Sequence, residues 1–262
     1  MDNLAEDEPE YENRIVVFID ILGFKEVVES KSVKEICDAI ESVHKLQEEQ
    51  LFSEVYEPAS GGELNPIDKQ ITVFSDSIVI SFVNSNELKY KLDLQNFFSM
   101  ICRLQNNLAK FQEKLIRGGI TEGLLYHKKD VCFGPALNRA YYLESVEAEF
   151  PRVLIDDCVI RKYGFNESDL FISIKDEKFY LDFLKIYRDY ITSPHRAEDS
   201  ILFSLLQFQK LIINGLNHTS SAVRKKYTWL AQEFNDVIGP TIDKEGAIEW
   251  FNEKLERIKI EN

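Results

Sequence analysis

The order of short apolar runs and long amphipathic stretches over residues 14–155 restricts the possible fold more than any other feature. Arg14–Ile19 is a β-branched run of strand length, and it stops at Asp20 and Gly23. Later segments repeat the two patterns: helical spacing in Val33–Phe52, Leu88–Leu115 and Ala136–Val146, and strand-like runs in Gln70–Phe74, Ile78–Val83, Ile120–Leu125 and Val153–Ile155. This βαββαβ order, followed by a helix and a strand, predicts an α+β, ferredoxin-like sheet covered by helices.

Residues 1–13 and 163–262 differ from this core. The first segment carries six acidic side chains and no basic one, which predicts an acidic disordered tail. The core is expected to span 14–162, with Gly118-Gly119 ending its long second helix. After a strand-like patch at Leu170–Ile174, a mainly helical C-terminal extension is expected, with helices at Phe179–Ile191, Ser200–Leu216, Ala222–Val237 and Ala247–Ile258.

The net charge of −14 argues against extended binding to DNA, RNA or anionic lipid, because a field of that sign repels phosphate backbones. A single metal-chelated nucleotide is still compatible with it. The four cysteines form no CxxC pair and the four histidines show no zinc-ligand spacing, so a disulfide framework and structural zinc are disfavoured. No signal peptide or membrane span is evident, and the expected location is the cytoplasm.

Two acidic residues end or interrupt apolar strands: Asp20 in VVFIDILGF and Asp76 in TVFSDSIVISF. Each alone has the ordinary explanation of a turn residue or helix cap. The first strand and the hairpin around Asp76 normally lie side by side in such a sheet, so both carboxylates are expected to point at one spot. Converging carboxylates favour Mg²⁺ or Mn²⁺ bound to substrate phosphates, and the turn at Gly23-Phe24 leaves backbone N–H groups near those phosphates.

Four segments, taken in order, resemble the catalytic domain of class III nucleotidyl cyclases over about Arg14 to Ile155. They are FIDILGF, TVFSDSIVISF, IRGGITEG and GPALNRAYYLES. The resemblance implies two metal ions, Mn²⁺ or Mg²⁺, held by Asp20, Asp76 and the backbone carbonyl of Ile21. It also implies a homodimer with composite sites, in which Asn138 of one subunit contacts the ribose at the metals of the other, and a ribose 3′-hydroxyl that attacks the α-phosphate while pyrophosphate leaves.

The departures from the family pattern concern the base and the transition state. Thr72 stands where purine cyclases usually carry a base-reading Lys, Val131 where they carry Asp or Thr, and Tyr142 where they carry a phosphate-stabilising Arg. Arg139 and Arg117 are candidate replacements, and the alternative for each is an ordinary ion-paired arginine. With both metal ligands kept, the combination resembles the bacterial pyrimidine cyclases of anti-phage Pycsar systems, which make cyclic UMP or cyclic CMP for a separate effector.

Three alternatives remain open from the sequence. One is a purine cyclase that reads its base through other residues, and another is an inactive nucleotide-binding dimerisation module. The third is a diguanylate cyclase, but its hairpin would carry a Gly-Gly-acidic motif where this chain reads Phe74-Ser75-Asp76-Ser77. The hypothesis that the sequence favours is a pyrimidine nucleotide cyclase, with UTP as the first substrate candidate and CTP as the second.

Overall fold

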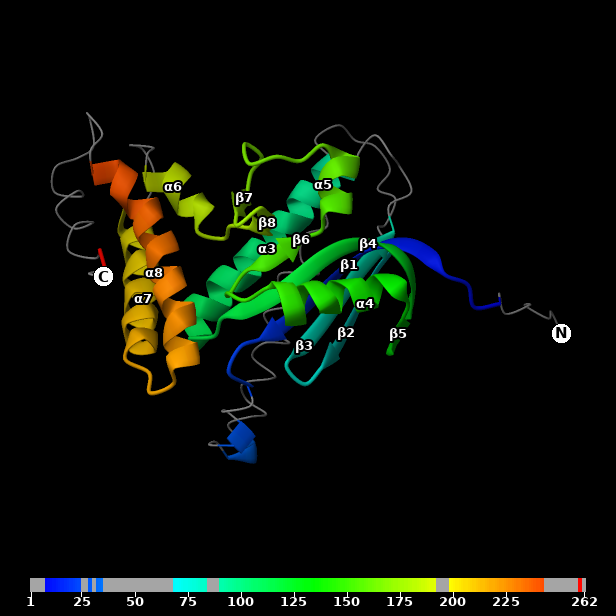
Figure 1. The fold of residues 1–262 in the computed structure, drawn as a ribbon, viewed down its shortest axis with the longest axis horizontal. Helices are drawn as coiled ribbons and strands as arrows, with labels where there is room; N and C mark the ends of the chain where they lie inside the picture. The colour runs from blue at the N-terminus through cyan, green and yellow to red at the C-terminus, as the bar shows by residue number, and fades with distance from the viewer. Residues whose placement is uncertain are drawn as a thin grey trace.

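The computed structural model describes residues 8–24, 28–29, 32–34, 68–83, 90–191, 198–242 and 259–260. They form a mixed α+β structure around one eight-stranded sheet, in the order β2-β3-β1-β4-β6-β8-β7, with β5 pairing on β4 (Figure 1). The elements are β1 (Glu12–Ile21), β2 (Asp68–Phe74), β3 (Ser77–Val83), α3 (Tyr90–Gln112), β4 (Ile116–Lys128), β5 (Val131–Phe133), α4 (Pro135–Tyr142), the π-helix η2 (Leu143–Glu147), β6 (Val153–Ile155), α5 (Asp157–Tyr163), β7 (Ile172–Lys175), β8 (Lys178–Leu181), α6 (Lys185–Ile191), α7 (Glu198–Leu216) and α8 (Ser221–Ile242).

The predicted α+β class is confirmed, and the order β2-β3-β1-β4 with antiparallel neighbours is the ferredoxin-like arrangement. Most of the predicted helix 33–52 and all of the predicted helix 247–258 lie outside the described residues. Strand β1 begins two residues before the predicted start, so Glu12 and Asn13 belong to the sheet and not to the acidic tail.

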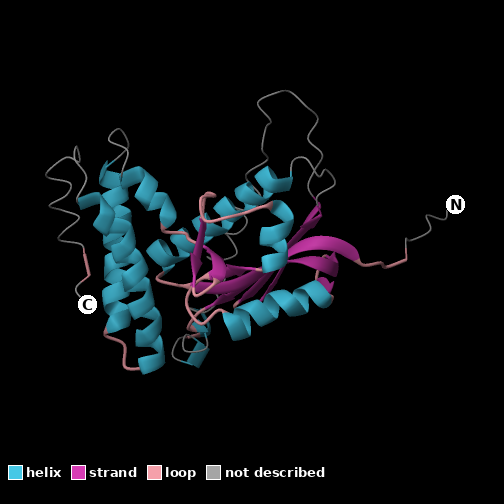
Figure 2. Ribbon diagram, turned by 45° about the horizontal axis from the view of Figure 1, so that its top comes forward, coloured by secondary structure: helices cyan, strands magenta, loops and turns pink. Residues whose placement is uncertain are grey.

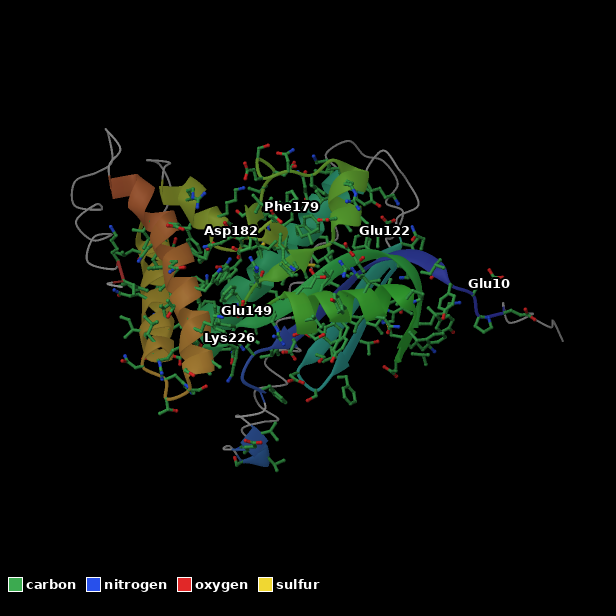
Figure 3. All side chains as sticks on the ribbon, viewed as in Figure 1. Glu10, Glu122, Glu149, Phe179, Asp182 and Lys226 are labelled. Atoms are coloured by element: carbon green, nitrogen blue, oxygen red, sulfur yellow. The ribbon has the colours of Figure 1, made fainter. Side chains whose placement is uncertain are left out.

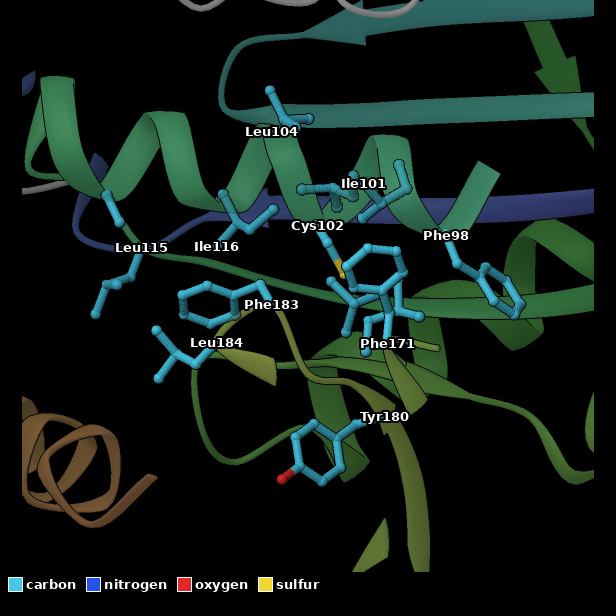
Figure 4. Packing of buried hydrophobic residues seen from close by; sticks show 14 of the residues in the cluster. Phe98, Ile101, Cys102, Leu104, Leu115, Ile116, Phe171, Tyr180, Phe183 and Leu184 are labelled. Atoms are coloured by element: carbon cyan, nitrogen blue, oxygen red, sulfur yellow. The ribbon is translucent and has the colours of Figure 1, made fainter. Parts of the chain in front are cut away.

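The central strand β1 is covered on both faces, which explains its almost continuous apolar sequence. Its odd-numbered residues, Ile15 to Ile21, belong to the large core with α3, whereas Val16 packs with α4 on the other face. Figure 2 shows the two helices on opposite sides of the sheet. Figure 4 shows the large core, where α3 side chains such as Phe98 and Cys102 meet Phe171 and Phe183 from the C-terminal part of the chain.

The C-terminal part is joined to the core by the sheet itself. Strand β8 pairs with β6, and β7 pairs with β8, so the predicted boundary at residue 162 does not divide the sheet. Residues 179–181 are strand where a helix was expected, because Tyr180 and Leu181 are buried beside β6, and α6 starts only at Lys185. Helices α7 and α8 pack against each other at one end of the molecule (Figure 1).

Gly118 and Gly119 do not end a helix as predicted, since α3 stops at Gln112 and both glycines lie inside β4. They allow the close approach of neighbouring backbone. A Cβ atom on Gly119 would lie 2.5 Å from the carbonyl oxygen of Ala140 and 2.5 Å from Leu143 Cβ, so the helix that follows β5 packs directly on this strand.

Gly119→Ala is therefore expected to lower the free energy of unfolding by about 1–3 kcal/mol, because α4 and η2 must shift to admit a methyl group. Gly123→Ala in the same strand is the matched control, since its Cβ would lie at an ordinary 3.4 Å from Ala136 Cβ. Urea unfolding of both variants measures the difference. Equal midpoints would contradict the close-approach explanation.

Candidate active site

Asp20 and Asp76 lie at the same end of neighbouring strands. Asp20 is the second-last residue of β1 and pairs with Ser77, the first residue of β3, while Asp76 lies in the turn just before it. The Ile21 amide donates a hydrogen bond to the Asp76 carbonyl oxygen at 3.1 Å, which fixes the two segments together. The structure thus brings the two predicted carboxylates to one edge of the sheet.

A partly buried ion pair lies beside Asp20. Arg117 on β4 pairs with Asp20 in the sheet register, yet its guanidinium is closest to Glu144 of η2, at 2.5 and 2.6 Å from Oε1. The distance from Arg117 Nη2 to Asp20 Oδ2 is 3.9 Å. Arg117 therefore serves mainly as the partner of Glu144, whose side chain is only 4% exposed, and leaves Asp20 loosely paired.

Negative charge accumulates at this edge. Burial raises the pKa of Asp20 to about 6, with Glu144 and Asp76 adding to the rise and Arg117 and Lys226 opposing it. Burial is also the main cause that raises the pKa of Glu144, against the pull of Arg117. Three carboxylates thus face two cations, one of which, Lys226, comes from helix α8.

This donor set fits a divalent cation that is shared with a substrate. Among the described residues, no three Asp, Glu, His or Cys side chains are grouped so that they could hold a metal ion by themselves. Asp20 and Asp76 supply two carboxylates, and the carbonyl of Ile21 would add a backbone oxygen. Magnesium and manganese accept such oxygen ligands and complete their shells with water and phosphate oxygens.

The turn after β1 leaves room beside these carboxylates. Gly23 has φ +81°, a left-handed conformation that favours glycine, and a Cβ there would meet no atom within 4 Å. The Phe24 side chain is buried, so any contact of Phe24 with a ligand would come from its backbone. Both observations are compatible with the predicted approach of phosphate oxygens to this turn.

Helix α4 presents Asn138 away from its own sheet. Ala136 and Ala140 are buried against the sheet, and Asn138, about 200° around the helix from each, is exposed. Tyr142 is also exposed. In this chain Asn138 therefore faces outward and not toward Asp20.

Arg139 is held in an ion-pair network within its own chain. Its guanidinium donates to Asp156 at 2.8 and 3.3 Å and to Glu147 at 2.9 Å, and it lies 5.5 Å from the ring centre of Tyr142. Arg139 and Arg117 thus both match the ion-paired alternative that the sequence left open for them.

Thr72 and Val131 lie on adjoining segments, and Thr72 ends a buried hydrogen-bond chain. Its hydroxyl donates to the Lys129 carbonyl at 3.0 Å and lies 2.8 Å from His127 Nε2. His127 Nδ1 lies 2.8 Å from Ser81 Oγ, which accepts a hydrogen bond from Arg14 Nε at 2.9 Å. Because Arg14 is an obligate donor, the Ser81 proton can point to Nδ1, which leaves Nε2–H to donate to Thr72.

Two site residues, Glu144 and Lys226, were not predicted from the sequence. Glu144 follows Ala140 by four residues, so it continues the buried face of α4 into η2, and a buried acid on an apolar helix face is a usable signal. A π-helical turn is itself frequent at functional sites. Lys226 has no comparable local signal, because only the packing of α8 brings it here.

No family model and no curated protein sequence matches the chain. Similar solved structures include the adenylyl cyclase CyaB from P. aeruginosa, with 18% identity over 66% of this chain and 95% of that chain and a TM-score of 0.47. Another is the catalytic core of a rhodopsin-guanylyl cyclase with converted specificity in complex with ATPαS. It is 14% identical over 66% of this chain and 96% of that chain, and its TM-score is 0.45. A bacterial light-regulated adenylyl cyclase is 13% identical over 79% of this chain and 59% of that chain, and its TM-score is 0.47. No helix in the described residues is both long and apolar enough to cross a bilayer.

Proposed function

We propose that this chain is a nucleotidyl cyclase that converts a pyrimidine nucleoside triphosphate, UTP or CTP, to its 3′,5′-cyclic monophosphate and pyrophosphate. The observation that carries the proposal is the meeting of Asp20 and Asp76 at one sheet edge, joined by the hydrogen bond from Ile21. Mg²⁺ or Mn²⁺ bound there would polarise the α-phosphate and lower the pKa of the attacking 3′-hydroxyl. The chain's own contribution is to hold the triphosphate and the ribose in line for attack.

The active form is proposed to be a homodimer with composite sites. Asn138 faces away from its own sheet, so it can contact a ribose only at the site of another subunit. Exposed apolar side chains occur on β2, on β5 and on α4: Phe74, Val131, Phe133, Tyr141 and Tyr142. Phe74, which is 79% exposed, pairs with Ser77 on β3, and Ser77 pairs in turn with Asp20 on β1. A second copy of the chain would cover these side chains beside the metal ligands.

The proposed base preference rests on Thr72 and Val131. The single proton of the Thr72 hydroxyl is used on the Lys129 carbonyl, so what remains for a base is a lone pair. Uracil offers its N3–H and cytosine its 4-amino group as donors to that lone pair. Val131, which is 53% exposed, adds only apolar surface. We place UTP first because the pyrimidine cyclases that the sequence resembles support it.

We expect kcat/KM for the preferred pyrimidine to exceed the values for ATP and GTP by at least about 10-fold, because the larger purine ring needs a longer pocket with a polar partner at its far edge, where this chain has Val131. Thr72→Val should lower the pyrimidine value about 2- to 12-fold, the loss expected for one neutral hydrogen bond. Thr72→Ser keeps the hydroxyl and is the matched control. Each NTP is incubated separately with Mn²⁺ and the products are resolved by mass. Turnover of ATP or GTP at or above both pyrimidines would favour the purine cyclase instead.

The product is proposed to act as a second messenger. In the Pycsar systems that the sequence resembles, a cyclic pyrimidine nucleotide activates a separate effector during phage infection. We extend that role to this chain on the resemblance alone.

A further inference from the structure

A cavity of about 330 Å³ lies where the turn after β1 meets helices α7 and α8. Its lining includes Leu22 and Gly23 from that turn, Lys114 from the α3–β4 connection, His218 from the α7–α8 connection, and Lys226 and Tyr227 from α8. The cavity is therefore shared between the proposed catalytic core and the C-terminal helices.

Lys226 connects this cavity to the carboxylate edge. It lines the cavity, and its charge acts on Asp20, Glu144 and Arg117. Among the described residues, Lys226 makes no hydrogen bond and no close ion pair to Asp20 or Glu144, and it acts on both through its charge. Its ammonium group is thus near the two carboxylates without forming an ion pair with either of them.

Helix α8 is docked firmly enough to position that lysine. Trp229 stacks on Phe150 with ring centres 5.3 Å apart and planes at 6°, and Glu233 binds Lys175 and the Tyr180 hydroxyl. One residue before Lys226, Lys225 Nζ lies 2.5 Å from Glu149. Figure 3 labels Lys226 and Glu149 where α8 meets the sheet. These contacts flank Lys226 on its own helix.

The cavity is locally cationic in a chain whose net charge is −14. Lys114 and Lys226 line it, and the acidic residue in its lining, Glu113, lies 3.0 Å from Lys210. Gly23 adds an unobstructed backbone turn. Lysines beside open backbone form a common environment for phosphate groups, and phosphates that bridge from here to Asp20 would need the cation expected there.

We infer that this cavity binds the terminal phosphates of the nucleoside triphosphate, and that Lys226 of α8 is a cationic ligand for them in the same subunit as Asp20. The inference rests on the proposed function and assigns a role to the C-terminal helices. They complete the phosphate end of the active site, whereas the partner subunit completes the ribose end.

The test compares Lys226→Gln with Lys225→Gln, its neighbour on the same helix. Inorganic tripolyphosphate binding is measured by calorimetry with Mn²⁺ present, and KM and kcat are measured with UTP and CTP. Lys226→Gln should weaken tripolyphosphate binding and raise KM about 10- to 100-fold, the range for one charged hydrogen bond. Lys225→Gln should stay within about two-fold, because exposed ion pairs contribute little.

Lys226→Arg separates charge from packing, since it should retain most of the binding that Lys226→Gln loses. Melting temperatures of all three variants verify that α8 remains docked. Tripolyphosphate affinity equal in Lys226→Gln and Lys225→Gln would overturn the inference and leave the cyclase proposal intact, provided that the wild-type protein makes cyclic nucleotide. A wild-type protein that makes none from any NTP, yet binds tripolyphosphate through Lys226, would overturn the cyclase proposal and keep the phosphate site.

Discussion

Asp20→Asn and Asp76→Asn are each expected to reduce cyclic nucleotide formation by at least about a thousand-fold, because each removes a charged oxygen ligand from a shared metal site. The substitutions keep the size of the side chain, so neither opens a cavity. Formation of cyclic nucleotide from the preferred NTP with saturating Mn²⁺, followed by mass spectrometry, measures the loss. Normal turnover in either variant would exclude the proposed metal ligands.

The same variants carry an internal check on folding. Asp20 is loosely paired with Arg117 and crowded by Glu144 and Asp76, so removal of its charge is expected to leave the melting temperature unchanged or to raise it. Asp157→Asn is the matched control, since Asp157 is an exposed acid whose one ion pair with the described residues is to Arg161, one turn along α5. It should leave both activity and melting temperature unchanged. A large drop in melting temperature for Asp20→Asn would indicate a structural role instead.

The sequence was sufficient for those parts of the fold that depend on local patterns. Strand β1 and the β2–β3 hairpin are apolar runs bounded by turn residues, and α3 and α7 repeat apolar residues at helical spacing for several turns. Once the strand order is known, the register of antiparallel pairs brings Asp20 opposite Ser77. The positions of the two strand ends in the sequence were therefore sufficient to predict that Asp20 lies beside Asp76.

The rest depends on tertiary contacts that leave weak local signals. Strands β5 and β8 have three and four residues, too few to establish an alternation. Strand β5 forms against the long strand β4, and β8 forms between β6 and β7. Gly119 looked like a helix stop because the close approach of Ala140 is invisible in one dimension. Lys226 is more than 200 residues from Asp20 along the chain, and only the docking of α8 unites them.

The two arginine candidates show the same limit at the level of single side chains. Helical geometry places Arg139 near position 142, but it cannot show that Asp156 and Glu147 already hold its guanidinium. Arg117 lies beside Asp20, but Glu144 takes the closer contact. Lys226 is left as the cation near the carboxylates without a close partner among the described residues, which is why the phosphate role is assigned to it.

Composite sites make a sharper prediction than the loss of activity in single variants. Asp20→Asn and Asn138→Ala homodimers should both be inactive, since one lacks a metal ligand and the other lacks its ribose contact. Mixed subunits should form heterodimers in which one of the two sites combines an intact Asp20 with an intact Asn138. At equal mixing about half of the dimers are heterodimers, so about a quarter of the wild-type activity is expected to return.

Mixing Asp20→Asn with Asp76→Asn is the control that separates shared sites from a general effect of mixing. Both lesions affect the half-site built from β1 and the β2–β3 turn, so each site of that heterodimer keeps one damaged metal centre and no activity should return. Differently tagged subunits, purified in tandem, demonstrate that exchange has occurred. Tagged heterodimers of Asp20→Asn with Asn138→Ala that remain inactive would exclude Asn138 as the partner's ribose contact. Suppose that activity returns when Asp20→Asn is mixed with Asn138→Ala but not when Asp20→Asn is mixed with Asp76→Asn. That result would show that Asn138 faces outward on α4 because it acts on the other subunit.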